Sequence, residues 1–415
     1  MPSDHPMTSG REPAARSGSR LARFAGACAF ALAATSLTVA PATPAGAAAT
    51  AVRPSEHRMF YEIEYKSHSW TMAQAIAQAR AFDTIIAVPQ AYKPEMVAAM
   101  RAANPALVLA GYNNGTLAQY GQKDTYPSSW YIRDPQGNKI MNDWNLWLMD
   151  PGNPAWVQNR LDECRKIIAK TQYNGCYLDN MGYGFIKYNP LTGKPINPRT
   201  RTFWTYADWQ KATSAETAYI NSQMPGVAIV ANGLVDGATF FGDPSSSSLL
   251  SASDAALSEV FIRGSNDSVT RTQSTAAWKQ DLDMVVRARQ LGKPIHVATK
   301  IWIPASTQQI KRWHDLAAAT FLLGTDGHVS SFHFSSARYE LPNLTGGNIA
   351  RIGTPIADYQ VVAGAYLRKF VAGIVVVNPT TETRTVNLGG VYTTDSGQRM
   401  SSVTLAPMTG SILAK

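Results

Sequence analysis

The chain has 415 residues, too many for one compact domain of ordinary size, and this length suits a barrel of about 250 residues with an appended domain. Its formal net charge is +9, of which residues 1–47 contribute +2 through four Arg, Asp4 and Glu12. The remaining Lys and Arg are scattered, which is typical of a solvated surface. The charge therefore argues against nucleic-acid binding and only weakly favours acidic glycans.

A processing signal opens the chain. Residues 24–39 are apolar and rich in Ala, they follow a basic stretch, and a small-residue cleavage site lies at 45–47; the basic residues are Arg16, Arg20 and Arg23. We expect residues 1–47 to be a secretory signal peptide that is removed near Ala47, so that the protein is secreted. A membrane anchor is the alternative, but Thr35 and Ser36 interrupt the apolar run, and no other segment is long enough to span a bilayer.

Two cysteines remain after the expected cleavage, because Cys28 lies within the signal segment. Cys164 and Cys176 are twelve residues apart, on a predicted helix and on the strand that follows it. Export permits a disulfide between them, and a pair of small buried residues is the alternative. Zinc is not expected, because no CxxC motif or spaced His pair accompanies them.

Strand-like and helix-like patterns alternate from residue 59 to residue 334. Eight apolar runs predict strands at 59–65, 84–88, 107–112, 175–180, 227–232, 256–262, 294–299 and 328–334. The clearest helices lie between them, at 72–81, 94–103, 154–170, 203–223, 276–291 and 308–323. Between the fifth and sixth strands, Asp243-Pro244 and a run of Ser leave room only for a short helix. This pattern predicts a (β/α)8 TIM barrel over residues 55–345.

Two loops of the predicted barrel are long. Residues 113–153 follow the third strand and contain Trp130 and Trp144 among Gly, Asn and Asp, and residues 182–201 follow the fourth. Loops of this length in a compact domain are usually functional. Exposed Trp rings would stack on sugar faces, whereas rings that only anchor the loop to the barrel rim are the alternative. We expect Tyr183, Phe185 and Tyr188 in the second loop to shape the substrate groove.

Two predicted strands carry an acid where a buried strand meets solvent. Asp179 ends the run Gly175-Cys176-Tyr177-Leu178, and Glu259 follows Ala256-Leu257-Ser258. The carboxyl ends of barrel strands converge on one active site. Glycosidic-bond hydrolysis needs one carboxyl group that stays protonated and another that stays ionised, so this pair predicts that chemistry. A salt bridge or a helix cap is the alternative for either acid alone.

Other polar and aromatic residues at predicted strand ends are candidates for substrate binding. Together with Trp130 and Trp144 they are Glu62, Tyr112, Asn113, Asp150, Asn180, Asn232, Lys300, Trp302 and His333. Glu62 and Glu64 share one face of the first strand and are equally plausible as structural acids in the barrel layer. No Gly-x-Ser-x-Gly elbow, Gly-rich phosphate loop or clustered metal site is evident, so we expect no cofactor and no metal.

The pattern changes from about Tyr366 to short strands without helices, separated by Gly, Pro and Thr. These runs predict a small antiparallel β domain over residues 360–415. Here a resemblance becomes visible. The tail looks like the C-terminal β-sandwich that follows the barrel in many glycoside hydrolases, through Arg368, Phe370, Gly373, Val375-Val376-Val377-Asn378-Pro379 and Leu405-Ala406-Pro407-Met408-Thr409-Gly410.

The barrel strands carry a second resemblance. Tyr177-Leu178-Asp179-Asn180 and Asp254-Ala255-Ala256-Leu257-Ser258-Glu259 resemble bacterial glycoside-hydrolase-like barrels that are distantly similar to the polygalactosaminidase and α-galactosidase groups. The resemblance implies Asp179 as nucleophile or electrostatic stabiliser, Glu259 as proton donor, and retention of anomeric configuration. No Glu follows Asp179 closely, and Met181 follows Asn180, so the chitinase-like pattern and the pattern with Asn-Glu after the fourth strand do not fit.

These observations predict a secreted glycoside hydrolase that acts on a polysaccharide or oligosaccharide, without a nucleic-acid partner or a stable membrane anchor. A non-catalytic carbohydrate-binding protein on the same scaffold is the alternative, since fold does not fix function. The two readings differ in geometry. Two carboxyl groups facing one site support hydrolysis, whereas Glu259 pointing into a helix layer would favour binding.

Overall fold

The computed structural model describes residues 61–64, 70–119, 121, 124–326, 330–336 and 347–415, all within one compact unit of the chain. The expected signal peptide, residues 1–47, lies outside the described residues. None of the helices within the described ranges combines the length and the apolar character needed to cross a membrane.

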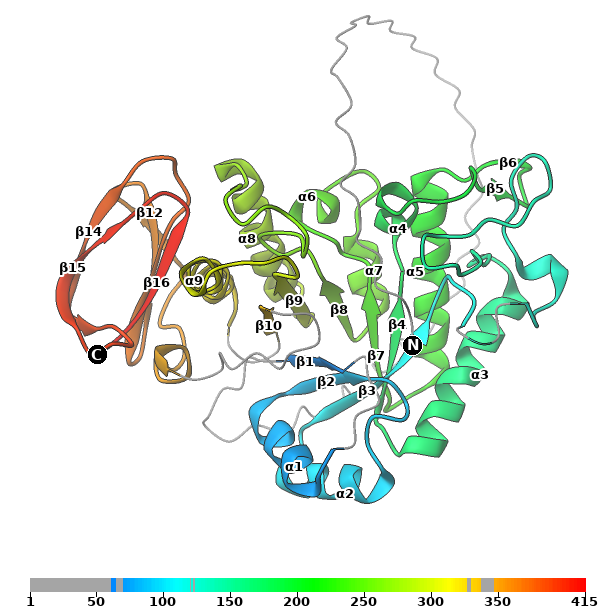
Figure 1. Ribbon diagram of the computed structural model, residues 1–415, viewed down its shortest axis with the longest axis horizontal. Helices are drawn as coiled ribbons and strands as arrows, with labels where there is room; N and C mark the ends of the chain where they lie inside the picture. The colour runs from blue at the N-terminus through cyan, green and yellow to red at the C-terminus, as the bar shows by residue number, and fades with distance from the viewer. Residues whose placement is uncertain (1–60, 65–69, 120, 122–123, 327–329, 337–346) are drawn as a thin grey trace, which may run out of the picture. The chain divides into compact units, whose positions relative to one another are not determined.

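Eight parallel strands form the central sheet of the described chain (Figure 1). Hydrogen bonds connect them in the order β1-β2-β3-β4-β7-β8-β9-β10, and β1 and β10 at the two ends contact each other. Their bounds are Tyr61–Glu64, Thr84–Ala87, Val108–Asn114, Gly175–Asp179, Ala228–Asn232, Ala255–Ser258, Ile295–Lys300 and Ser331–Ser335. All eight predicted strands are present, and the predicted barrel is confirmed as a nearly closed parallel sheet.

Helices connect these strands, and most start at capped residues. The long ones are α1 (Met72–Ala81), α2 (Pro94–Ala103), α3 (Pro154–Thr171), α5 (Tyr206–Gln223), α8 (Thr275–Gln290) and α9 (Thr307–Gly324). Thr71 and Ser306 form capping boxes with Gln74 and Gln309. Only α6 (Gly237–Phe240) and α7 (Ser247–Ala252) lie between β7 and β8, as the Ser-rich sequence there predicts.

Alternate residues of the strands face two different cores. On β4, Cys176 and Leu178 pack into the core shared with the helices, whereas Tyr177 packs with Ala110, Val230, Leu257 and Ala298 inside the barrel. Because the side-chain period of a strand is two, the face of Tyr177 is also the face of Asp179. The fold therefore directs Asp179 inward at the carboxyl end of β4.

The segments after β3 and β4 contain more structure than loops. Ser128–Trp130 forms the short helix η1, and residues 182–201, expected to be a loop, contain α4 (Tyr183–Tyr188) and β5 (Ile196–Asn197). β5 pairs with β6 (Thr202–Phe203) as a hairpin, so the helix predicted from residue 203 begins only at Tyr206. Cys164 of α3 and Cys176 of β4 form a disulfide, which resolves the open alternatives for this pair.

A six-stranded antiparallel sheet closes the chain. Its order is β11-β12-β13-β16-β14-β15, with bounds Gln360–Val362, Ala365–Phe370, Gly373–Asn378, Thr409–Ala414, Arg384–Thr393 and Arg399–Leu405. Ile374 and Val376 of β13 pack into the sheet's own core. Val375 and Val377, on the other face, join the core of the barrel helices, and β13 and β16 contact α9. The C-terminal sheet is thus packed directly against the barrel.

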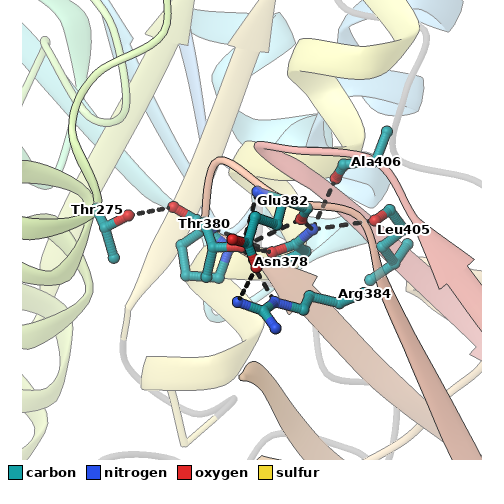
Figure 2. A network of polar contacts seen from close by, with 8 residues as sticks. Thr275, Asn378, Thr380, Glu382, Arg384, Leu405 and Ala406 are labelled. Carbon is teal, nitrogen blue, oxygen red and sulfur yellow. Dashed lines mark hydrogen bonds and ion pairs between the residues drawn. The ribbon is translucent and has the colours of Figure 1, made fainter. Parts of the chain in front are cut away.

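The turn after β13 is held by one amide side chain (Figure 2). Asn378 Nδ2 donates to the carbonyl oxygens of Glu382, Leu405 and Ala406, at 2.7, 3.0 and 3.0 Å. Thr275, at the start of α8, donates its hydroxyl to the Pro379 carbonyl at 2.6 Å. This network ties the C-terminal sheet to the amino end of α8.

Candidate active site

Asp179 ends β4 as a buried carboxylate surrounded by hydrogen-bond donors. Its Oδ1 accepts from Asn232 Nδ2 at 2.8 Å, from its neighbour's backbone N–H at 2.9 Å and from the Tyr177 hydroxyl at 3.3 Å. Its Oδ2 accepts from the Tyr112 hydroxyl at 2.6 Å. β3, β4 and β7 are neighbours in the sheet, so their carboxyl ends bring these groups together. Donors alone satisfy an ionised carboxylate, which can only accept.

Two opposing influences act on the acidity of Asp179. Burial raises the pKa of Asp179, because it disfavours the charged form, and the charge of Glu259 raises it further. The hydrogen bonds from Tyr112, Asn232 and the Asn180 N–H lower it, and the net pKa is raised. The charge of Glu259 is therefore one of the effects that oppose ionisation of Asp179.

Glu259 follows β8 directly and belongs to the inner side of the barrel. Lys300, at the end of neighbouring β9, donates to Glu259 Oε1 at 2.8 Å. The Lys300 side chain is 5% exposed and that of Glu259 31% exposed, so the carboxyl group reaches toward solvent. The Lys300 Nζ also lies 5.1 Å from the centre of the Trp302 ring. Glu259 therefore does not point into the helix layer.

A buried acid on α8 holds the backbone of the segments that follow β7 and β8. Asp281 accepts from the Gly237 N–H at 2.7 Å, after β7, and from the Ile262 N–H at 3.0 Å, after β8. Burial raises the pKa of Asp281 to about 7, against the lowering effect of the Gly237 N–H. Val235 and Ile262 have φ angles of 61° and 68°, which β-branched residues rarely adopt. Strain of this kind collects at functional sites.

Three further predicted residues belong to the barrel interior or to the connections beside it. Asn180 has a φ of 60°, and its side chain donates to Asn114 Oδ1 at 3.2 Å. His333 is buried on β10 in register with Ala298, an inner-face residue. Trp302 is half-buried beside Lys300. Within the described ranges, no three His, Cys, Asp or Glu side chains are grouped so that they could hold a metal ion.

The structure gives Asn113 and Asp150 other partners. Asn113 Nδ2 donates to the Arg160 carbonyl of α3 at 3.0 Å, and Arg160 Nη1 donates to Asn113 Oδ1 at 2.9 Å. This corrects the expectation for Asn113, because the neighbour of an inward Tyr112 must face outward. Asp150 binds both terminal nitrogens of Arg199, at 2.9 and 3.1 Å, and so joins the two long segments.

The predicted loop tryptophans differ in exposure. Trp130 is half-buried and packs on Tyr126 and Trp156, with ring centres 5.8 and 6.2 Å away, which matches the anchoring alternative. Trp144 is 38% exposed. Glu62 lies on β1 in register with Ile85, but its side chain is outside the described part of the structure.

Sequence reasoning missed three contributors. Tyr177 was read only as a strand residue, although its hydroxyl reaches the carboxylate two positions along the same face. Asn114 lies two residues beyond the predicted end of its strand and is in register with Asp179. No sequence pattern indicates Asp281, since a single buried acid in an amphipathic helix cannot be distinguished by sequence from an acid on the helix surface. The strand alternation could have found Tyr177 and excluded Asn113.

Comparisons with known proteins give a family match and similar solved structures. The chain matches the model of Hypothetical glycosyl hydrolase family 15 over residues 96–374. An α-amylase from Anoxybacillus shares 10% identity, with a TM-score of 0.52, over 87% of this chain and 99% of its own. The glycoside hydrolase domain of PelA from Pseudomonas aeruginosa shares 15% identity, with a TM-score of 0.45, over 66% of this chain and 94% of its own.

At such identities the likeness to the amylase shows the fold alone, and no curated protein matches the chain by sequence. The family match carries more weight, because it spans most of the chain, including the strands that bear Tyr112, Asp179, Asn232 and Glu259. The chain therefore belongs to Hypothetical glycosyl hydrolase family 15 and is a glycosidase of the barrel type.

Proposed function

We propose that the protein hydrolyses O-glycosidic bonds of an oligosaccharide or polysaccharide, with Asp179 and Glu259 as the reacting carboxyl groups. One observation carries the proposal. A buried carboxylate with four hydrogen-bond donors lies at the carboxyl end of a barrel strand, near enough to a second carboxyl group to sense its charge. Such a pair can supply both the negative charge and the proton that glycosidic cleavage needs.

The hydrogen bonds favour different roles for the two acids. Oδ1 of Asp179 accepts three hydrogen bonds, whereas Oδ2 accepts only one, from Tyr112, so Oδ2 retains the capacity to attack an anomeric carbon. Glu259 is the more exposed of the two acids and lies beside Lys300, and we assign to it the proton transfer to the leaving oxygen. Asp179 would be the nucleophile, and Glu259 the acid that later acts as base.

Substitution of each carboxyl group tests these roles. We expect Asp179→Asn and Glu259→Gln to lower kcat on nitrophenyl glycosides and polysaccharides by at least about a thousandfold without unfolding the protein. Glu163→Gln is a matched control, because Glu163 is also paired with a lysine, Lys166 at 2.5 Å, but on the outer helix α3. Near-normal turnover in either site variant would remove that residue from the catalytic pair, whereas glycan binding without turnover in the parent protein would favour the non-catalytic alternative.

The covalent mechanism predicts retention of configuration. Attack by Asp179 requires carboxyl groups about 5–5.5 Å apart, whereas a gap of about 6.5–9.5 Å would admit a water and give inversion. Proton NMR of the first-formed product decides between them. Release of the opposite anomer would rule out Asp179 as nucleophile and leave it as general base.

We further propose that the protein is exported and that residues 1–47 are removed. The disulfide between Cys164 and Cys176 supports this, because such bonds persist in oxidising compartments. Intact mass spectrometry of protein recovered from the culture medium should show a chain that begins near Ala48. A chain retained in the cells with its N-terminus intact would contradict export.

A further inference from the structure

We propose that three exposed aromatic side chains form a binding surface for a polysaccharide chain beside the catalytic carboxyl groups. The surface, called here the aromatic platform, consists of Tyr188, Tyr206 and Phe241, which are 54%, 43% and 46% exposed. The inference rests on the proposed glycosidase function. It adds that the substrate is a polymer, which the aromatic platform binds at a distance from the reacting carboxyl groups.

The three rings gather around Tyr183 and Thr239. The Tyr183 ring lies 5.9 Å from the Tyr206 ring, and its hydroxyl donates to the Thr239 carbonyl at 2.9 Å. The Tyr188 hydroxyl lies 3.5 Å from the Thr239 hydroxyl, and Phe241 follows two residues later. Although α4, α5 and α6 are separate in sequence, they therefore present their exposed rings at one place.

Two of the three rings lie on connections that leave the strands of the catalytic site. α4 begins four residues after Asp179, and α6 begins five residues after Asn232, so both connections start at the strands that form the carboxylate site. Both helices lie toward the top of Figure 1. Four extended steps and five helical rises limit the Cα separation of Tyr188 from Asp179 to about 22 Å. A single bound oligosaccharide can span that distance.

The chemistry of the platform suits sugars. Tyr rings combine an apolar face with a hydroxyl group, and concave or flat sites that bind sugars use aromatic walls with a few polar groups. The Lys187 Nζ lies 4.9 Å from the centre of the Tyr188 ring and adds a donor at its edge. A stable protein partner would need about 800 Å² of surface with a fully buried apolar core, and three separated rings with charged neighbours offer less.

Variants of the platform test the proposal on defined probes. Tyr188→Ala, Tyr206→Ala and Phe241→Ala are made singly and together, first in the Asp179→Asn background. Retardation in native gels containing soluble starch, dextran, polygalacturonate or carboxymethyl-cellulose measures binding without turnover. We expect the triple change to raise the Kd for the retarding polysaccharide by at least about tenfold. Tyr219→Ala is the control, because Tyr219 is 41% exposed nearer the other end of α5.

Activity measurements on the triple variant then distinguish a role of the platform in substrate binding from a role in the reaction itself. With Asp179 present, the triple variant should lose kcat/KM on the polysaccharide by a much larger factor than on a nitrophenyl glycoside, mainly through a raised KM. An equal loss on both substrates, or no retardation of the parent protein by any of the four polysaccharides, would overturn the platform. A dimer that the triple variant abolishes, measured by sedimentation, would instead assign this surface to a second copy. Persisting activity in Asp179→Asn would refute the proposed mechanism, while the gel result still decides the platform.

Discussion

At the scale of single residues, the surroundings of Asp179 have opposing effects on its pKa. Burial and the charge of Glu259 raise its pKa, and each donor hydrogen bond lowers it. As the proposed nucleophile, Asp179 must be ionised, so activity should rise with pH through this raised pKa. The acidic limb of the kcat/KM profile therefore reports directly on the carboxylate.

Removal of one hydrogen-bond donor to Asp179 should move the acidic limb of the kcat/KM profile to higher pH. We expect Tyr112→Phe, which deletes the 2.6 Å bond to Oδ2, to shift the acidic limb by about one pH unit to higher pH, because the charged form loses stabilisation. Asn232→Ala should do the same through Oδ1. Tyr173→Phe is the control, since its hydroxyl bonds the Val88 carbonyl at 3.3 Å instead. A limb that stays in place or moves to lower pH would show that another group controls it.

At the scale of elements, α8 positions the two segments that flank the carboxyl groups. Asp281 binds the backbone after β7 and after β8, where Val235 and Ile262 hold unfavourable φ angles. Each such residue costs on the order of 1–3 kcal/mol, so these segments need an external constraint. Val260 also donates to the Val235 carbonyl at 3.1 Å, which couples the two segments.

Asp281→Asn tests this positioning role. The new amide NH2 would face one of the two backbone donors, so one hydrogen bond is lost and the Glu259 segment loosens. We expect kcat to fall by about tenfold or more, with a smaller change in KM, when measured well below Tm. Asp254→Asn is the matched control, because Asp254 accepts the Ile229 N–H at 2.8 Å at the opposite end of the barrel. If both variants lose kcat only in proportion to their unfolded fraction, Asp281 is structural.

At the scale of the whole molecule, the C-terminal sheet packs against the barrel and binds the end of one of its helices. Arg368 of β12 is 2% exposed and donates to the carbonyls of Leu322 and Leu323 at 2.9 and 3.0 Å, and also to that of Thr325. These carbonyls end α9 and have no partner within the helix. Burial lowers the pKa of Arg368 to about 10, so it remains charged at neutral pH.

Arg368→Met should therefore destabilise the barrel as well as the sheet. Three helix-end carbonyls would lose their donor, and we expect the free energy of unfolding to fall by about 3–5 kcal/mol in chemical denaturation. Arg384→Met on β14 is the control, because its exposed pair with Glu382 should contribute less than about 1 kcal/mol. Separate transitions for barrel and sheet, with only the sheet destabilised, would contradict a shared core.

Most of the local structure follows from short-range sequence signals. Apolar runs, helix periodicity and caps such as Thr71 and Ser306 are local signals, so the eight strands and the long helices lay close to their predicted bounds. Asp179 and Glu259 could be identified from the sequence as candidate catalytic acids for a related reason. A charged residue that ends a buried strand is exceptional, and in a parallel barrel all strand ends of one kind meet.

Which side chains meet depends on the packing of segments that are distant in sequence. Asn113 and Tyr112 are adjacent in sequence, yet one faces α3 and the other Asp179, because strand alternation separates neighbours and the closing sheet selects the inner face. Asp150 pairs with Arg199, and Asp281 accepts hydrogen bonds from Gly237 and Ile262. The residues in these contacts are 19 to 49 positions apart in the sequence. Such contacts leave no local pattern, since their free energy arises only when distant segments are packed together.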